Sequence, residues 1–257
     1  MQMVDVLGLP FGVADYGCAA DAIIDMAKAP RPTAVAACAT HPVTEARLHK
    51  EFFDVLKGFN LLLPDGMPLV WLMKTRGVSL LDRVYGPHLM RCVIERTPKP
   101  YRHFLFGGSP ECLIQLEMQL KRVQPELQLV GSLSPPYRKW SEGDEDGFAK
   151  TITQANPDFI WVALGGGKQE RWISQNRHRY GRGVFLAVGD AFELLAGRRR
   201  FAPNWMQRAG LGWCYRLVQE PRRLWKRYLF YNTIFIGFSI VQIVTDLLER
   251  IHIDRVA

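Results

Sequence analysis

The sequence predicts an α/β protein with a Rossmann-like, mostly parallel sheet flanked by helices. Short apolar runs recur along the chain and end at glycine or turn residues, at 33–38, 59–63, 104–106, 159–164 and 183–188. Continuous apolar runs of this length are typical of strands buried on both faces of a parallel sheet. Segments of helical character lie between them, and this alternation favours a parallel sheet. A chain of 257 residues fits one large domain, or one domain with an appendage.

The charge distribution divides the chain into two parts. Residues 198–231 hold nine Arg or Lys and one acid, Glu220, so this segment accounts for the whole net charge of +8. We therefore expect an α/β core over residues 1–197 and a basic appendage over residues 198–257. A basic segment this dense is typical of proteins that meet anionic lipid, a diphosphate or nucleic acid.

The cysteines and the amino terminus indicate the compartment. Five scattered cysteines, with no Cys-x-x-Cys pair, argue against a zinc site or a disulfide framework and fit a reducing cytosol. The amino terminus lacks a basic region followed by an apolar core, so we expect no secretory signal.

The first candidate ligand contact is His41. Residues Val4 to Phe11 are predicted as a strand or loop, and a helix is expected from about Ala14 to Lys28. Thr33 to Cys38 is a predicted buried strand, and His41 follows it near the start of another helix. In open α/β sheets, ligands bind beyond the carboxyl ends of the strands, so His41 is placed for contact. A solvated loop histidine is the alternative.

A sharper motif follows the next strand. The apolar run Phe59 to Leu63 leads into Pro64-Asp65-Gly66, which presents Asp65 before a helix expected at about 69–75. Asp65 is either a carboxylate at the ligand-binding edge or a helix N-cap. Further on, the planar fork of donors on Arg83 suits a diphosphate, and a surface salt bridge is the alternative.

The middle of the chain contains an acidic cluster. Phe104 to Phe106 is a predicted strand before Gly107, and a helix is expected over residues 110–123. After a strand at 127–130, the segment 132–147 is predicted to be a loop that contains Asp144-Glu145-Asp146. Since no apolar strand precedes this Asp-x-Asp, we interpret it as a solvated charge run and not as a metal–nucleotide site.

A glycine-rich turn follows the strand at 159–164. Gly165, Gly166 and Gly167 precede Lys168 and Gln169, where a helix should begin. A strand, a glycine loop and a helix start can bind an anion through backbone N–H groups and the helix dipole. The alternative is a strand-to-helix turn that binds nothing.

The C-terminal residues form a different kind of segment. Tyr228 to Thr245 carries no charged residue, a length at the threshold for a membrane-spanning helix. Polar residues recur at helical period, which indicates an amphipathic helix: Asn232, Ser239, Gln242, Asp246 and Glu249. With the preceding cations Arg222, Arg223, Lys226 and Arg227, this predicts a helix on an anionic membrane surface. The alternatives are packing on this protein's own core, a homo-oligomer interface, or a true span.

Several of these motifs resemble, in order, those of the WecG/TagA/CpsF family, bacterial glycosyltransferases of family 26. The family's pattern of Asn-Pro-Asp, an apolar strand and Leu-Gly-x-Pro-Lys-Gln-Glu is matched over residues 156–170, with Gly167 in place of proline. Pro64-Asp65-Gly66 matches the family's Pro-Asp-Gly. In the motif after the strand at 183–188, Glu193 replaces an aspartate. The resemblance covers roughly residues 5–231.

The resemblance implies roles for individual residues. Asp65 corresponds to the family's proposed catalytic base. Substrate-binding residues would be His41, Arg83, Gln169, Arg216, Arg223 and Lys226, with Gln169 holding the donor sugar. Nucleotide-binding residues would be Gly107, Gly165, Lys168, Gly189 and Glu193.

The resemblance also implies an activity. It is the inverting transfer of a sugar from a UDP-sugar to a polyprenyl-diphosphate-linked sugar, for bacterial cell-surface polysaccharide. The enzyme would be peripheral, on the cytoplasmic face of the inner membrane, with no metal, no cofactor and no nucleic-acid partner.

Two other function classes make different demands on the sequence. A nicotinamide-dependent oxidoreductase needs Gly-x-Gly-x-x-Gly after the first strand, which residues 1–40 lack. A noncatalytic membrane-surface or nucleotide-binding module gives Asp65 and Gln169 no role.

Overall fold

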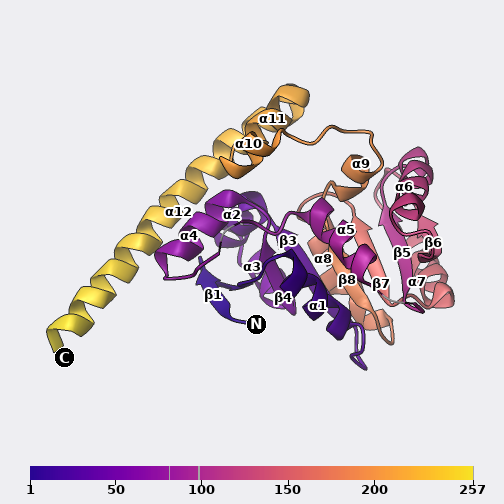
Figure 1. Ribbon diagram of the computed structural model, residues 1–257, viewed down its shortest axis with the longest axis horizontal. Coiled ribbons are helices and arrows are strands. Elements are labelled where there is room, and N and C mark those ends of the chain that lie inside the picture. The colour runs from indigo at the N-terminus through magenta and orange to yellow at the C-terminus, as the bar shows by residue number, and fades with distance from the viewer. Residues whose placement is uncertain (81, 98, 257) are drawn as a thin grey trace.

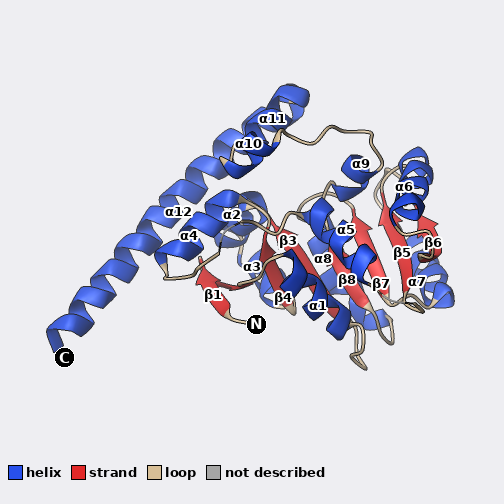
Figure 2. Cartoon of the chain, viewed as in Figure 1, coloured by secondary structure: helices blue, strands red, loops and turns tan. Residues whose placement is uncertain are grey.

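The computed structural model describes residues 1–80, 82–97 and 99–256, with side chains described as far as His252. Its centre is an eight-stranded sheet in the order β1-β2-β4-β3-β8-β7-β5-β6 (Figures 1 and 2). The strands are β1 (Met3–Val6), β2 (Leu9–Gly12), β3 (Thr33–Cys38), β4 (Leu61–Pro64), β5 (Arg102–Gly107), β6 (Gln128–Leu133), β7 (Phe159–Ala163) and β8 (Val184–Ala187). Only the β1–β2 pair is antiparallel, so the predicted mostly parallel α/β sheet is confirmed.

Helices cover both faces of the sheet. One face carries α1 (Tyr16–Met26), α5 (Gly86–Arg96), α6 (Pro110–Val123) and α9 (Ala191–Leu195). The other carries α2 (Thr40–Leu48), α3 (Lys50–Lys57), α4 (Met67–Thr75), α7 (Glu142–Ala155) and α8 (Lys168–Asn176). A 3-10 turn, η1 (Arg177–Arg179), follows α8.

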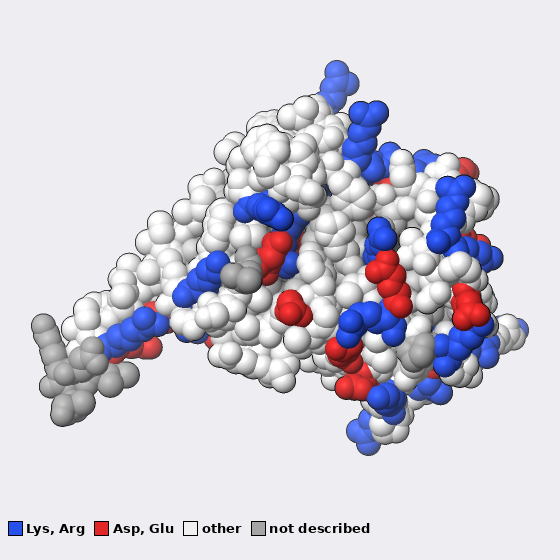
Figure 3. Space-filling model, viewed as in Figure 1, with Lys and Arg blue, Asp and Glu red and all other residues white. Residues whose placement is uncertain are grey.

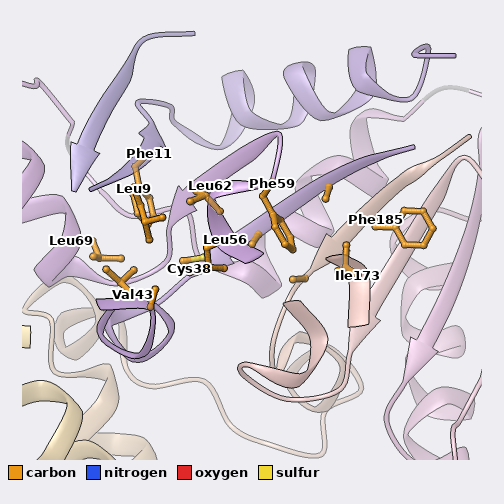
Figure 4. Close-up of a cluster of buried hydrophobic side chains, with 14 of the residues drawn as sticks. Leu9, Phe11, Cys38, Val43, Leu56, Phe59, Leu62, Leu69, Ile173 and Phe185 are labelled. Carbon is orange, nitrogen blue, oxygen red and sulfur yellow. The ribbon is translucent and has the colours of Figure 1, made fainter. Parts of the chain in front are cut away.

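The core is buried on both faces because side chains alternate along each strand. In β4, Leu62 packs into the cluster under α2, α3 and α4, whereas Leu61 and Leu63 pack into the opposite cluster. Figure 4 shows part of the first cluster, with Val43 and Leu69 on helices and Leu9 and Leu62 on strands. Burial on both faces is why these strands appear in the sequence as unbroken apolar runs.

The strand order creates a switch point at the centre of the sheet. β3 and β8 are neighbours and run parallel. The chain leaves β3 toward α2 on one face and leaves β8 toward α9 on the other. Loops that diverge in this way open a crevice at the carboxyl ends of the strands, where α/β proteins bind ligands.

The structure adds detail to two segments and corrects a third. Residues 4–11, predicted as a strand or loop, form a hairpin whose turn, Leu7 and Gly8, has positive φ angles of 53° and 84°. Residues 50–57, for which no element was predicted, form the amphipathic helix α3. The predicted loop at 132–147 is wrong, because β6 reaches Leu133 and α7 begins at Glu142.

Capping chemistry explains the helical start of α7. Ser141 is the N-cap, its Oγ accepts from the Asp144 N–H, and the Asp144 carboxylate accepts in return from the Ser141 N–H. This reciprocal capping box satisfies N–H groups that the helix leaves free. Asp144 also pairs with Arg138 at 2.6 Å, and Asp146 pairs with Arg179.

The C-terminal residues form α10 (Asn204–Arg208), α11 (Gly212–Gln219) and the long helix α12 (Pro221–Val256). Figure 1 shows α12 running along the outside of α2 and α4 and ending away from the sheet. Its polar stripe faces the protein. Asn232 Oδ1 accepts from Thr40 Oγ1 at 3.3 Å, and Gln242 Oε1 accepts from the Leu7 N–H at 3.0 Å.

Many apolar side chains of α12 nevertheless point outward. Those at least half-exposed include Leu229, Phe230, Ile236, Ile240, Val241, Leu247 and Leu248. The side toward the core is mixed, because Phe235 is buried there beside the polar stripe, so α12 does not have the simple amphipathic pattern expected from the sequence. The part of the chain described here contains no helix that is both long enough and apolar enough to span a membrane.

The close contact of β5 with β7 gives a stability prediction. Gly107 has φ +125°, and a Cβ there would lie 2.3 Å from the Ala163 carbonyl oxygen. Gly107→Ala should lower the free energy of unfolding by at least about 2 kcal/mol, measured by urea denaturation, because backbone must move. Gly147→Ala is the control. That glycine lies within α7 with no neighbour within 4 Å, so alanine should stabilise by about 0.5–1 kcal/mol. Equal effects of the two changes would contradict this packing.

Candidate active site

A cavity of about 530 Å³ lies at the carboxyl ends of β3, β4 and β8. The loops after these strands contribute Thr40, Asp65 and Asp190 to its wall. α4, α10, α11 and α12 supply the remaining sides. The cavity is therefore at the switch point of the sheet, closed on its outer side by the C-terminal helices.

Asp65 stands at the inner end of this cavity. Its backbone N–H donates to the Cys38 carbonyl at 2.8 Å, which fixes the turn after β4 against β3. The residue is partly exposed to the cavity, but Oδ1 is buried and has no hydrogen-bond partner. Burial raises the pKa of the Asp65 carboxyl to about 7, Asp190 acts in the same direction, and Arg83 and Arg216 oppose them. Such a carboxyl can take up and release a proton near neutral pH.

Arginines surround this carboxyl. The Arg83 guanidinium stacks 4.2 Å from the centre of the Tyr85 ring and donates to the Asp65 carbonyl at 3.3 Å and to Gln207 Oε1 at 2.9 Å. Arg216 lies 3.3 Å from the Asp190 carboxylate. The other arginines of the lining are Arg199, Arg200 and Arg227. Side chains of this kind bind phosphate oxygens with paired N–H donors.

His41 lies in the wall of the cavity, as expected for a residue just beyond β3. Its ring packs edge-on against Tyr231 at 4.2 Å, and its Nδ1 is buried without a partner. Burial, with smaller contributions from Arg227 and Arg171, lowers the pKa of His41 to about 4. The imidazole is therefore neutral at pH 7 and can both donate and accept a hydrogen bond.

The glycine loop lies behind His41. A Cβ on Gly166 would be 3.7 Å from His41 Nδ1, whereas Gly165 has φ +90° and open space beside it. Gly167 has φ +81°, and its N–H donates to Glu170 Oε2 at 2.7 Å. Proline could adopt neither feature, since its φ is fixed near −65° and it has no N–H. Glycine in place of the family's proline therefore gives this loop a conformation of its own.

Gln169 is buried and supports the site from outside the cavity wall. Its Oε1 accepts from the Gly189 N–H at 3.2 Å, and its Nε2 donates to Glu170 at 3.0 Å. The bond to Gly189 joins the start of α8 to the loop after β8. Lys168 points away, with Nζ 3.9 Å from the centre of the Trp140 ring. Neither side chain is part of the cavity wall.

The other predicted contacts also lie outside the cavity wall. Gly107 packs against Ala163, and Glu193 pairs with Arg198 at 3.2 Å. Arg223 is largely exposed and pairs with Glu220, and the Lys226 ammonium lies 5.5 Å from the centre of the Trp225 ring.

The structure adds cavity residues that the sequence reasoning missed. Asp190, Tyr85, Arg199 and Arg227 all line the cavity. Two signals could have identified some of them. Asp190 directly follows the strand-and-glycine motif at 184–189, and Arg227 lies one helical turn beyond Arg223. Arg199 had no such signal, because its contacts depend on how the chain turns after α9.

Fold and site together are those of an α/β protein with an arginine-lined cavity that contains a carboxyl of raised pKa. The model of the glycosyl transferase WecG/TagA/CpsF family matches residues 4–247, so the chain belongs to this family and is a glycosyltransferase. The oxidoreductase and noncatalytic alternatives are set aside.

Two Bacillus proteins are among the relatives. One, from Bacillus subtilis, is an N-acetylglucosaminyldiphosphoundecaprenol N-acetyl-beta-D-mannosaminyltransferase, 32% identical over 181 residues, or 70% of this chain and 68% of the relative. A protein of the same description from Bacillus spizizenii is 31% identical over 186 residues, or 72% and 70% of the two chains.

Among the residues that the structure describes, no group of three or more His, Cys, Asp or Glu side chains is arranged to hold a metal ion.

The raised pKa of Asp65 predicts a pH-dependent stability. The folded protein holds this proton up to about pH 7, whereas an unfolded chain releases it near pH 4. Because the folded state binds more protons between these values, its stability falls as pH rises from about 4 to 7. Asp65→Asn removes this loss. The difference in unfolding free energy between Asp65→Asn and the wild type should therefore shift by about 1–3 kcal/mol in favour of the variant as pH rises from 4.5 to 8, measured in urea titrations.

The matched control is Asp54→Asn, at an exposed position on α3. Its stability profile should run parallel to that of the wild type. A parallel profile for Asp65→Asn as well would mean that Asp65 is not protonated in the folded state near neutral pH.

Proposed function

We propose that this enzyme transfers an N-acetylhexosamine from a UDP-sugar to a polyprenyl-diphosphate-linked sugar, with inversion at the anomeric carbon. The product would serve bacterial cell-surface polysaccharide synthesis. The observation that carries the proposal is a carboxylate with a raised pKa and several arginines around one cavity. The relatives' names favour N-acetylmannosamine as the donor sugar and an N-acetylglucosamine-diphosphate lipid as the acceptor.

In the proposed reaction, Asp65 acts as the general base. Its carboxylate takes the proton of the acceptor hydroxyl while that oxygen attacks the anomeric carbon. The bond from the anomeric carbon to the UDP oxygen breaks, and UDP leaves with the electron pair. A carboxyl whose pKa is about 7 is well matched to this task, because it is ionised in part and still basic.

Arginine side chains would stabilise the charge of the leaving UDP. Arg83 and Arg216 are fixed by Gln207 and Asp190, so little reorganisation is needed when charge develops. Arg227 also lines the cavity, whereas Arg223 and Lys226 face solvent. We therefore assign the diphosphate to Arg83, Arg216 and Arg227, and the exposed pair to the membrane surface.

The remaining predicted residues would shape the donor site. We propose that neutral His41 hydrogen-bonds a substrate hydroxyl from the cavity wall. Gln169 would hold the loop at Gly189 in place. Gly165 and Gly189 lie outside the cavity wall, so we propose a supporting role for them. We propose supporting roles near the nucleotide for Gly107, Lys168 and Glu193.

The outer face of α12 supports a peripheral membrane position. Figure 3 shows few charged side chains along most of this helix, and its exposed residues include Phe230, Val241 and Leu248. Basic residues Arg222 and Lys226 are exposed at its start. Apolar residues that enter the interface, with cations near anionic headgroups, bind a helix to a membrane. We propose the cytoplasmic face of the inner membrane, where a polyprenyl-diphosphate acceptor would be available.

Loss of the base should slow turnover without loss of donor binding. Asp65→Asn should lower kcat by roughly 10² or more, measured as UDP release with a lipid-diphosphate acceptor. UDP affinity, measured by calorimetry, should stay close to that of the wild type. Wild-type kcat/KM should rise with pH through about 7, because the base must be deprotonated. Near wild-type turnover in Asp65→Asn would remove Asp65 from the mechanism.

The membrane face can be tested by placing charges on it. Val241→Glu with Leu248→Glu should weaken binding to anionic liposomes at least about tenfold in flotation assays, because two carboxylates would enter the interface. Ile114→Glu with Met118→Glu, on similarly exposed apolar positions of α6, should leave binding unchanged. If the α12 pair leaves liposome binding intact and converts an oligomer to monomers in sedimentation, this face is a subunit interface instead.

A further inference from the structure

The cavity that contains Asp65 continues as a groove between α4 and α12. Its inner end is polar and carries the arginines described above. Its outer part is lined by carbon-rich side chains: Met67, Trp71 and Leu72 from α4, and Phe235, Ile236 and Ile240 from α12. One continuous cavity therefore changes from charged to apolar along its length.

The lining residues follow one face of each helix. On α4 they recur from Met67 to Thr75, and on α12 from Tyr228 to Ile243, in steps of three and four residues. At about 1.5 Å per residue, the α12 side is about 22 Å long. Beyond it, Arg76 Nε donates to Asp246 Oδ2 at 2.7 Å and ties the end of α4 to α12.

The inner part of the groove is covered, and the outer part is open. A Cβ on Gly210 would lie 2.7 Å from the Trp71 ring and 3.3 Å from Met67 Cβ, so the turn between α10 and α11 rests directly on α4. Ile236 and Ile240, in contrast, are 59% and 57% exposed. A molecule in the groove would enter beside these isoleucines and reach Asp65 under the turn.

The outer groove has little to offer a sugar or a nucleotide. Its polar side chains already have partners: Ser239 Oγ donates to the Phe235 carbonyl at 2.8 Å, and Thr75 Oγ1 donates to the Leu72 carbonyl at 2.7 Å. Asn232 bonds Thr40. Hydroxyl groups placed there would lose water without gaining partners, which is costly. The walls favour a hydrocarbon chain.

We propose that this groove binds the first isoprene units of the polyprenyl acceptor, a proposal that rests on the function proposed above. Charge decides the orientation. The acceptor diphosphate would lie at the polar inner end, where Arg199 and Arg200 line the cavity in addition to the arginines assigned to UDP, and the chain would extend between α4 and α12 past Ile240. Beyond it the exposed apolar residues of α12, such as Leu247, continue the same surface. The chain would thus pass from the bilayer to the active site against apolar surface throughout.

A chain-length series of soluble acceptors tests the groove. The acceptors carry the same sugar diphosphate on one to six isoprene units and are used below their critical micelle concentration. Wild-type KM should fall as the chain lengthens and then become constant once the chain is longer than the groove. Ile240→Glu, which places a carboxylate in the wall, should raise KM for the longest acceptor at least about tenfold. Its kcat and its KM for the one-unit acceptor should not change.

Val241→Glu is the matched control, because Val241 is 63% exposed on the same helix but is not part of the groove. It should keep the wild-type dependence of KM on chain length. Ile236→Glu is the second groove variant, should Ile240→Glu fail to fold. The contrary outcome is that Ile240→Glu, Ile236→Glu and Val241→Glu all transfer sugar to the one-unit acceptor and have identical chain-length profiles. This would overturn the groove proposal and leave the proposed function standing.

Crosslinking tests the groove even if the proposed reaction is wrong. The probe is a short isoprenyl diphosphate, without sugar, that carries a diazirine on its second unit. Mass spectrometry should find the label on groove residues such as Trp71, Leu72, Ile236 and Ile240. Ile240→Glu should lose this label, and Val241→Glu should keep it. Labelling only on the outward residues Val241, Val244 or Leu248, or equal labelling in both variants, would show that the chain does not occupy the groove.

Discussion

The parallel direction of β3, β4 and β8 is the constraint on which the site depends. Parallel neighbours place all their carboxyl ends at one edge, so loops that are far apart in the sequence meet there. Asp65 and Asp190 are 125 positions apart in the chain but line the same cavity. The Gln169 side chain then joins the start of α8 to the loop after β8, so the edge is fixed by hydrogen bonds as well as by the sheet.

Charge balance at this edge determines the chemistry. Asp65 and Asp190 repel each other, and burial adds to that cost, but Arg199 and Arg216 approach Asp190 at 3.8 and 3.3 Å. Each carboxylate has a buried oxygen without a hydrogen-bond partner, but Asp190 forms ion pairs with two arginines. Burial raises the pKa of the Asp65 carboxyl to about 7, which fits the role of general base that we propose for it.

α12 combines two environments on one helix. Its polar side is bonded to Leu7, Thr40 and Arg76, which fixes the helix against the core by specific contacts. Its apolar side is left exposed, with residues such as Leu229 and Leu248 more than 60% accessible. Large apolar patches on a protein surface mark sites of interaction with membranes or other proteins. Arg227 of the same helix lines the cavity, so the surface that would meet lipid and the active site share one rigid element.

The sequence by itself determined the buried parallel strands and the residues that follow them at the carboxyl edge of the sheet. Buried parallel strands leave unbroken apolar runs, and the residue after such a run lies at the carboxyl edge by geometry, as Asp65 and His41 do. The first turns of helix α7 were predicted as a loop because their acidic residues look solvated, although one of these residues closes a capping box.

Tertiary structure decided the rest, because spacing gives the period of a pattern but not its direction. The polar stripe of α12 was evident in the sequence, but only packing against Thr40 and Arg76 turned it toward the protein. Likewise, the sequence shows the basic segment only as a run of cations, and the packing of α11 and α12 decides where each side chain points. Arg216 and Arg227 then face the cavity, and Arg223 faces solvent, since each position on a helix points in a different direction.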